Sequence, residues 1–254
     1  MEEQQHPRDM ANRLVAALQG DEFVLYAQSI VPLLPGSDEW PFQEIFVRFA
    51  EEDAKLLPPG TFLPVLEEFR LLPYLDRWVV NRLARWVRSG LSIKPEWHIP
   101  RSNVNLSSTT LLDPGYGDYV RKYVEDSYLS NGVLAFEVAW DDVTGHADAV
   151  RLLMEKLRPC GCGFTLSGFD GAKESFQAIE ALAPDFVKIS PAIGAHVHDD
   201  PAYAERVAEI SHRCHVLGIK TIAEQVESSV ALETLRGASI DFAQGFGIAP
   251  VQAL

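Results

Sequence analysis

The sequence predicts an α/β fold, a (β/α)8 barrel of the TIM type with one reversed strand. Eight apolar, β-rich segments occur along the 254 residues, and most of them are separated by segments with helical periodicity. The first two segments are joined only by turn residues, PLLPGSDEWPF, so they are expected to form a hairpin. One hairpin strand must then run against a parallel sheet. An open doubly wound sheet also holds eight strands, so the pattern alone leaves that alternative open.

Each element is predicted from its own period. The expected strands are 23–31, 44–50, 102–107, 134–139, 163–169, 186–190, 221–226 and 242–246. Helices are expected over 75–87, 118–129, 150–157, 176–182, 203–217 and 229–236, and Gly218 is expected to end the fifth of them. Residues 1–18 are interpreted as a helical lead-in or linker, a candidate for the end of a linker from an upstream domain. Residues 19–254 are interpreted as one domain.

The composition excludes several classes of function. Apolar residues are 47% and charged residues 23%, as in soluble globular proteins, and no apolar run approaches the ~20 residues that cross a bilayer. The net charge of −14 argues against nonspecific binding to DNA, RNA or an anionic membrane. The three cysteines provide no disulfide framework, which favours a reducing, cytoplasmic setting. An anionic ligand would therefore need a locally basic pocket.

Polar side chains recur at the carboxyl ends of the expected strands, where a parallel barrel carries its chemistry. An unpaired polar group buried there would cost about 2–7 kcal/mol, so each needs a partner. Either these side chains satisfy one another as a network, or they form a functional site. They are Asn105, Glu137, Ser167, Lys188, Glu224 and Gln244.

Several segments, in a fixed order, carry a resemblance to a known family. They are FVLYAQSIV with Gln28, TFLPVLEEFRLLPYLDRWVV, NVNLS, AFEV, DFVKIS, IAEQVES and FAQGF. From about residue 19 to the C-terminus the chain resembles the EAL-domain family, whose active members hydrolyse the bacterial messenger cyclic di-GMP. The family's fold is a (β/α)8 barrel with one reversed strand, in agreement with the independent strand count.

Two motifs depart from the family pattern. The signature tripeptide is Glu44-Ile45-Phe46, followed by Val47-Arg48, so the glutamate and the arginine remain. Where the family has DDFGTG, this chain has SGFDGA at 167–172. The resemblance therefore places Ser167 and Gly168 at two positions where active members carry metal-ligating aspartates.

Hydrolysis at a two-metal site needs hard oxygen ligands that hold the ions and activate water. Glu44, Asn105, Glu137 and Glu224 match ligand positions of the family, but Ser167 offers only a hydroxyl and Gly168 offers nothing. We therefore expect no catalysis, no resident divalent metal and no other cofactor. Glu44, together with Lys188, which resembles the family's catalytic lysine, would then be vestigial.

The resemblance also implies a binding set for cyclic di-GMP. Arg48 suits a bidentate phosphate contact, and Phe246 lies where a guanine can stack, worth about 1–3 kcal/mol per base. Three glutamates would face a dianion, and each unit pair at ~4 Å costs about 4 kcal/mol at an effective dielectric of ~20. Lys188 or Arg48 must neutralise them, a carboxylate must be protonated, or the ligand must lie further out. The expected set is Gln28, Glu44, Phe46, Val47, Arg48, Asn105, Glu137, Lys188, Glu224, Gln244 and Phe246.

Three functions remain open at this point. The leading hypothesis is a catalytically inactive cyclic di-GMP receptor of the FimX type that signals through a protein partner. The second is a protein-interaction module that has lost the ligand, because Trp140 replaces a family glutamate and either crowds the pocket or packs in the core. The third is a residual metal-dependent phosphodiesterase.

Overall fold

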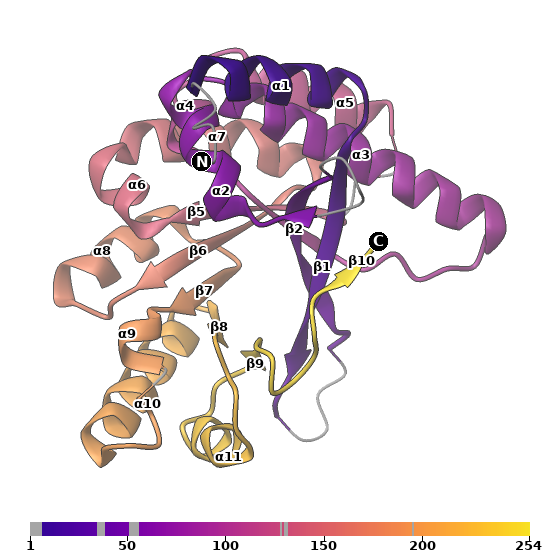
Figure 1. Cartoon of the computed structure of the whole chain (residues 1–254). Helices are drawn as coiled ribbons and strands as arrows, with labels where there is room; N and C mark the ends of the chain where they lie inside the picture. The colour runs from indigo at the N-terminus through magenta and orange to yellow at the C-terminus, as the bar shows by residue number, and fades with distance from the viewer. Residues whose placement is uncertain (1–6, 35–38, 51–55, 128, 130–131, 195) are drawn as a thin grey trace, which may run out of the picture.

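A closed barrel of eight strands forms the centre of the molecule (Figure 1). The structure is a computed structural model that describes residues 7–34, 39–50, 56–127, 129, 132–194 and 196–254. The predicted fold class is confirmed. The barrel strands are β1 (Phe23–Pro32), β2 (Phe42–Ala50), β4 (Ser102–Asn105), β5 (Leu134–Ala139), β6 (Gly163–Phe169), β7 (Phe186–Ile189), β8 (Lys220–Ala223) and β9 (Phe242–Ala243).

The reversed strand is β1, as the hairpin prediction required. From β2 to β9 the neighbouring barrel strands pair in parallel, whereas β1 is antiparallel to both β2 and β9 and so closes the sheet. Closure excludes the doubly wound alternative. Two short strands were not predicted, β3 (Leu56–Leu57) beside β2 and β10 (Gln252–Ala253) beside β1, because two residues carry no readable alternation.

Helices surround the barrel, and each predicted helix is present with shifted ends. The helices are α1 (Pro7–Gln19), α2 (Pro59–Glu68), α3 (Leu72–Ile93), α4 (Ser108–Leu111), α5 (Tyr116–Glu125), α6 (Trp140–Gly145), α7 (Ala147–Leu157), α8 (Lys173–Leu182), α9 (Pro191–Gly194), α10 (Pro201–Val216) and α11 (Ser229–Gly237), with a 3-10 turn, η2 (Arg158–Cys160). Gly218 follows α10 with a φ of +73°, the left-handed conformation in which glycine commonly ends a helix. Among the described helices, none is both long and apolar enough to span a bilayer.

Apolar side chains seal the end of the barrel where the parallel strands begin. Phe42, Phe186 and Phe242 stand at the first positions of β2, β7 and β9, with ring centroids 4.9–5.5 Å apart. Ile30 and Ile222 complete this cluster. Polar side chains lie beyond this cluster: Asn103 Nδ2 donates to Thr165 Oγ1 at 3.0 Å, and both residues are fully buried.

The first helix is part of the packed structure. Leu14 and Ala17 of α1 are fully buried in the main core, and α1 contacts α2 and α3 (Figure 1). The division into a lead-in of residues 1–18 and a domain of residues 19–254 stays a prediction, and residues 1–6 lie outside the described part of the chain.

Replacing Leu14 tests how far α1 stabilises the barrel. Leu14→Ala should lower the free energy of unfolding by about 2–5 kcal/mol, because it removes a fully buried side chain and leaves a cavity. Urea denaturation measures the change. Asn12→Ala, on the exposed face of the same helix, is the control. An equally small effect of both substitutions would mean that α1 does not contribute to the stability of the barrel.

Candidate functional site

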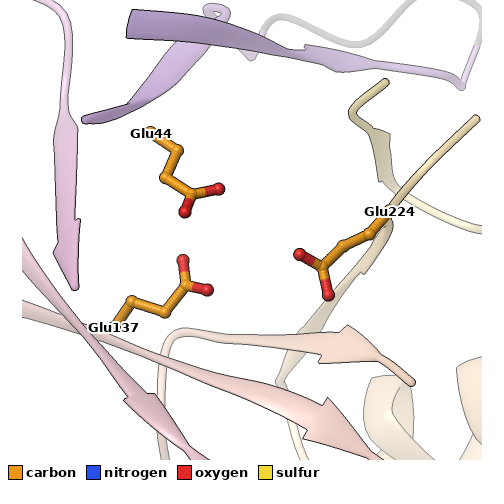
Figure 2. A group of neighbouring side chains, drawn as sticks. All are labelled: Glu44, Glu137 and Glu224. Atoms are coloured by element: carbon orange, nitrogen blue, oxygen red, sulfur yellow. The ribbon is translucent and has the colours of Figure 1, made fainter. Parts of the chain in front are cut away.

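Three glutamates converge at the open end of the barrel (Figure 2). Glu44 lies in β2, Glu137 in β5, and Glu224 directly follows β8, so strands far apart in the sequence bring them together. One carboxylate oxygen from each lies within 4.8 Å of the others. Glu44 and Glu137 are buried, and Glu224 is half-buried.

Lys188 of β7 extends into the middle of this group and is completely buried. Its Nζ lies 2.6 Å from Glu44 Oε2, 2.7 Å from Glu137 Oε2 and 3.4 Å from Glu224 Oε1. Burial opposes the charge of the ammonium, but the carboxylates of Glu137, Glu44 and Glu224 outweigh burial and raise the pKa of Lys188. The ammonium is therefore a fixed cation within the site.

The three carboxyls do not titrate alike. Burial opposes ionisation of Glu44, but the charge of Lys188 and its hydrogen bond hold the pKa of Glu44 below its usual value. Burial raises the pKa of Glu137 to about 8 against the attraction of Lys188, and the charges of Glu44 and Glu224 add to the rise. Burial also raises the pKa of Glu224. Near neutral pH the group therefore holds a proton, mainly on Glu137.

Amide side chains complete the network around Glu44. Asn105 Nδ2 donates to Glu44 Oε1 at 2.8 Å, and Gln244 Nε2 donates to Glu44 Oε2 at 2.8 Å and to Gln28 Oε1 at 3.1 Å. Gln28 Nε2 in turn donates to the carbonyl oxygen of Ala249 at 3.0 Å. The predicted residues of four strands thus meet, and most of their polar atoms satisfy one another.

Two buried acceptors of this network receive no hydrogen bond, Glu137 Oε2 and Gln244 Oε1. The 2.7 Å contact of Glu137 Oε2 with Lys188 is an ion pair without hydrogen-bond geometry. Unmatched acceptors at this depth are uncommon in folded proteins. A further donor at this place would stabilise the site.

Two adjoining cavities open beside the network, and Asn105 and Ala139 line both of them. The first, of about 440 Å3, is polar and lies over the carboxylates; its lining is completed by Glu44, Glu137, Trp140, Asp141, Ser167, Gly168 and Glu224. The second, of about 410 Å3, is mainly apolar and lies between β2, α2 and α3; its lining includes Phe46, Val47, Phe62, Leu63, Leu75, Asp76 and Asp142. The two shared residues place the cavities side by side.

The remaining predicted residues do not contact the carboxylates. Phe46 and Val47 line the apolar cavity. The Arg48 guanidinium lies 5.6 Å from the centre of the Tyr26 ring and donates from Nη1 to the Val47 carbonyl oxygen at 3.0 Å. Phe246 is 71% exposed. Lys188 therefore neutralises the glutamates, while Arg48 makes its contacts elsewhere.

Comparison with protein-family models decides the family. Residues 11–251, nearly the whole chain, match the model described as EAL domain. This chain belongs to the EAL domain family.

Individual EAL-domain proteins resemble the chain along its length. The cyclic di-GMP phosphodiesterase PdeB of Shewanella oneidensis is 26% identical over 244 residues, 96% of this chain but only 28% of PdeB. The FimX EAL domain of Xanthomonas citri, solved in complex with c-diGMP, superposes with a TM-score of 0.87 at 25% identity, covering 98% of this chain and 95% of that one. The c-di-GMP complex of the MucR phosphodiesterase of Pseudomonas aeruginosa gives a TM-score of 0.83 at 26% identity, covering 96% of this chain and 97% of the solved MucR chain.

The residues present do not suit the pair of divalent metals that the EAL family implies. The spacing of the three glutamates suits one ion, but the Lys188 ammonium occupies their centre. Ser167 and Gly168 add no carboxylate. Asp170 is engaged elsewhere, accepting from the Ala172 amide at 3.0 Å and from Ser175 Oγ at 2.6 Å at the start of α8.

Two acidic residues that line the apolar cavity, Asp76 and Asp142, do not belong to the predicted ligand-binding set. Asp76 is buried and accepts from Ser107 Oγ at 2.7 Å and from the Ser107 amide at 3.1 Å. Burial raises the pKa of Asp76, although hydrogen bonds from Thr110 and Ser107 oppose the rise. The sequence pattern indicated that Asp76 is unusual, because it stands between Leu75 and Val79 on an otherwise apolar helix face.

Glu137→Gln should flatten the pH dependence of stability. The pKa of Glu137 is raised on folding, so its stabilising proton is fully present below about pH 4.5 and is lost as the pH rises towards about 8. The glutamine side chain is neutral at every pH, like the protonated form of Glu137. The free energy of unfolding, measured by urea denaturation from pH 5 to 8.5, should therefore fall less steeply in Glu137→Gln than in the unchanged chain. Glu180→Gln, exposed on α8, is the control, and identical slopes for all three proteins would contradict the assignment.

Lys188→Met should be strongly destabilising, because it leaves the buried Glu44 and Glu137 and the half-buried Glu224 without their cation. We expect a loss of about 3–5 kcal/mol at pH 8, and a smaller loss at pH 5, where Glu137 is protonated. The same denaturation experiment measures it, with Lys122→Met on the exposed side of α5 as the matched control. A loss that does not change with pH would show that packing, and not charge, dominates.

Proposed function

We propose that this EAL domain is a catalytically inactive receptor for cyclic di-GMP that passes its signal on through protein–protein contacts. The observation that carries the proposal is the Lys188 ammonium at the centre of the three glutamates, beside an intact pair of cavities. The cation needed to balance the carboxylates is supplied by the chain itself. Ligand binding then requires no metal.

The absence of catalysis is argued from the ligands. Hydrolysis of a phosphodiester by two metals needs enough carboxylates to hold both ions and to activate a water molecule. Here Ser167 and Gly168 supply none, and the three glutamates are already paired with Lys188. A residual phosphodiesterase remains the least favoured candidate.

The apolar cavity suits a guanine base. Phe46, Val47 and Phe62 supply flat apolar contacts, while Asp76 and Asp142 place carboxylates at its edge. The N1–H and N2–H2 groups of guanine are donors that match such acceptors. One base would lie here, and Phe246, exposed near the end of the barrel, would stack against the other.

The phosphates would lie over Asn105 and towards Arg48. Arg48 commits one nitrogen to the Val47 carbonyl, so the rest of its guanidinium is available for a charge-assisted contact. The repulsion expected from three glutamates is reduced, because Lys188 carries one positive charge and Glu137 is mainly protonated at neutral pH. The buried acceptors that lack a donor would also gain from ligand hydroxyls.

Two solved structures of related proteins support cyclic di-GMP as the ligand. The FimX and MucR structures at 25% and 26% identity were both solved with c-di-GMP bound. This chain spans only 28% of the length of PdeB, so its protein partner is proposed only as a class. We propose that the two proteins interact in the cytoplasm. The alternative, a protein-interaction module that has lost the ligand, is favoured by one observation: Trp140 lines the polar cavity.

Calorimetry with cyclic di-GMP in EDTA tests the proposal. We expect binding in EDTA, no tighter binding with Mg²⁺, and no turnover in either buffer. Arg48→Ala should weaken binding about 10–100-fold, as expected for a lost charge-assisted contact, whereas Arg151→Ala, exposed on α7, should not.

The other outcomes separate the alternatives. No heat in either buffer would overturn the receptor proposal and leave the interaction module. Binding or turnover that appears only with Mg²⁺ would overturn the proposed inactivity.

A further inference from the structure

We infer that Trp140 and the backbone at Gly168 exclude divalent metals from this barrel, in addition to the two missing carboxylates. The inference rests on the proposed absence of catalysis and concerns its structural basis. Trp140 and Gly168 both line the polar cavity beside Glu137 and Glu224. They lie next to each other, because a Cβ on Gly168 would stand 3.7 Å from Trp140 Cβ.

The backbone of β6 is irregular at this point. Leu166 pairs with Val187 and Phe169 with Ile189, so three steps along β6 match two along β7, which is a bulge at Ser167 and Gly168. Gly168 has a φ of +77°, a conformation that residues with a side chain adopt at a cost. A carboxylate at position 168 would therefore be strained, and its first carbon would touch Trp140.

Trp140 is held in place from behind. Its ring stands edge-on to Phe169 at 5.3 Å, and Phe169, which is fully buried, stands edge-on to Phe176 at 5.1 Å. The Arg213 guanidinium covers the outer face of Phe176 at 3.5 Å. If the half-buried indole turned outwards it would lose its edge contact with Phe169, so this contact favours the position beside the cavity.

An indole is unsuitable next to a hydrated ion. Mg²⁺ and similar dications retain several water molecules, which need space and hydrogen-bond partners around the site. Trp140 instead presents apolar surface beside the positions where new carboxylates would hold the ion. Introducing aspartates at positions 167 and 168 alone should therefore not create a metal site. Removing the Trp140 indole as well should strengthen metal binding.

Manganese binding tests the inference, with calorimetry on four proteins: the unchanged chain, S167D/G168D, S167D/G168D/W140A and S167D/G168D/W140F. We expect at least tenfold tighter Mn²⁺ binding in the alanine triple variant than in S167D/G168D. The phenylalanine variant, which keeps an aromatic ring, should bind Mn²⁺ as weakly as S167D/G168D. Turnover of cyclic di-GMP with Mn²⁺ is a second readout.

Two results would overturn the inference: equal Mn²⁺ affinity in the double and both triple variants, or tight binding already in S167D/G168D. If circular dichroism shows that S167D/G168D does not fold, S167D is compared with S167D/W140A, because Ser167 still pairs regularly with Ala139 of β5. Binding of cyclic di-GMP to the unchanged chain in EDTA is independent of this comparison. If the Mn²⁺ experiment contradicts the role of Trp140, the receptor proposal is unaffected. If the unchanged chain does not bind cyclic di-GMP, the Mn²⁺ experiment still tests the role of Trp140.

Discussion

The rest of the site depends on one buried ammonium. Taking Lys188 out of water costs several kcal/mol, and the surrounding acidic side chains of Glu44, Glu137 and Glu224 offset that cost. They come from β2, β5 and the end of β8, so the ion pairs form only when the barrel has closed in its correct register. The electrostatics of the site and the topology of the fold therefore depend on the same contacts.

The amides around this centre set its geometry. Asn105 and Gln244 each donate to a different oxygen of Glu44, which fixes the plane of that carboxylate while Lys188 approaches the same oxygen as Gln244. Such a fully surrounded carboxylate remains charged although it is buried. Glu137, which receives no comparable hydrogen bonds, holds the proton instead. Two glutamates in one site thus differ in charge: burial and the neighbouring glutamates raise the pKa of Glu137, whereas Lys188 and the two amide donors lower that of Glu44.

The barrel and most of the polar site could be predicted from the sequence, because strand period and strand-end polarity are local signals. The hairpin, the reversed strand, Glu137 and Lys188 follow from them, whereas Glu44 was expected from the resemblance to the EAL-domain family. Asp142 could not be predicted as part of a cavity, because the short helix α6 that carries it has too few residues to show a period. The position of Arg48 over Tyr26 and the bulge at Gly168 depend on strand register, which only the closed barrel determines.

The hydrogen bond between Gln28 and Gln244 joins residues 216 positions apart in the chain. The first and last barrel strands meet there, so the complete site requires residues 28–244 to have been synthesised. Contacts of such long range close late in folding, since the entropy of a large loop must be overcome first. A nascent chain that ends before Gln244 therefore lacks this closing hydrogen bond, and the complete site forms only after the last barrel strand has been added.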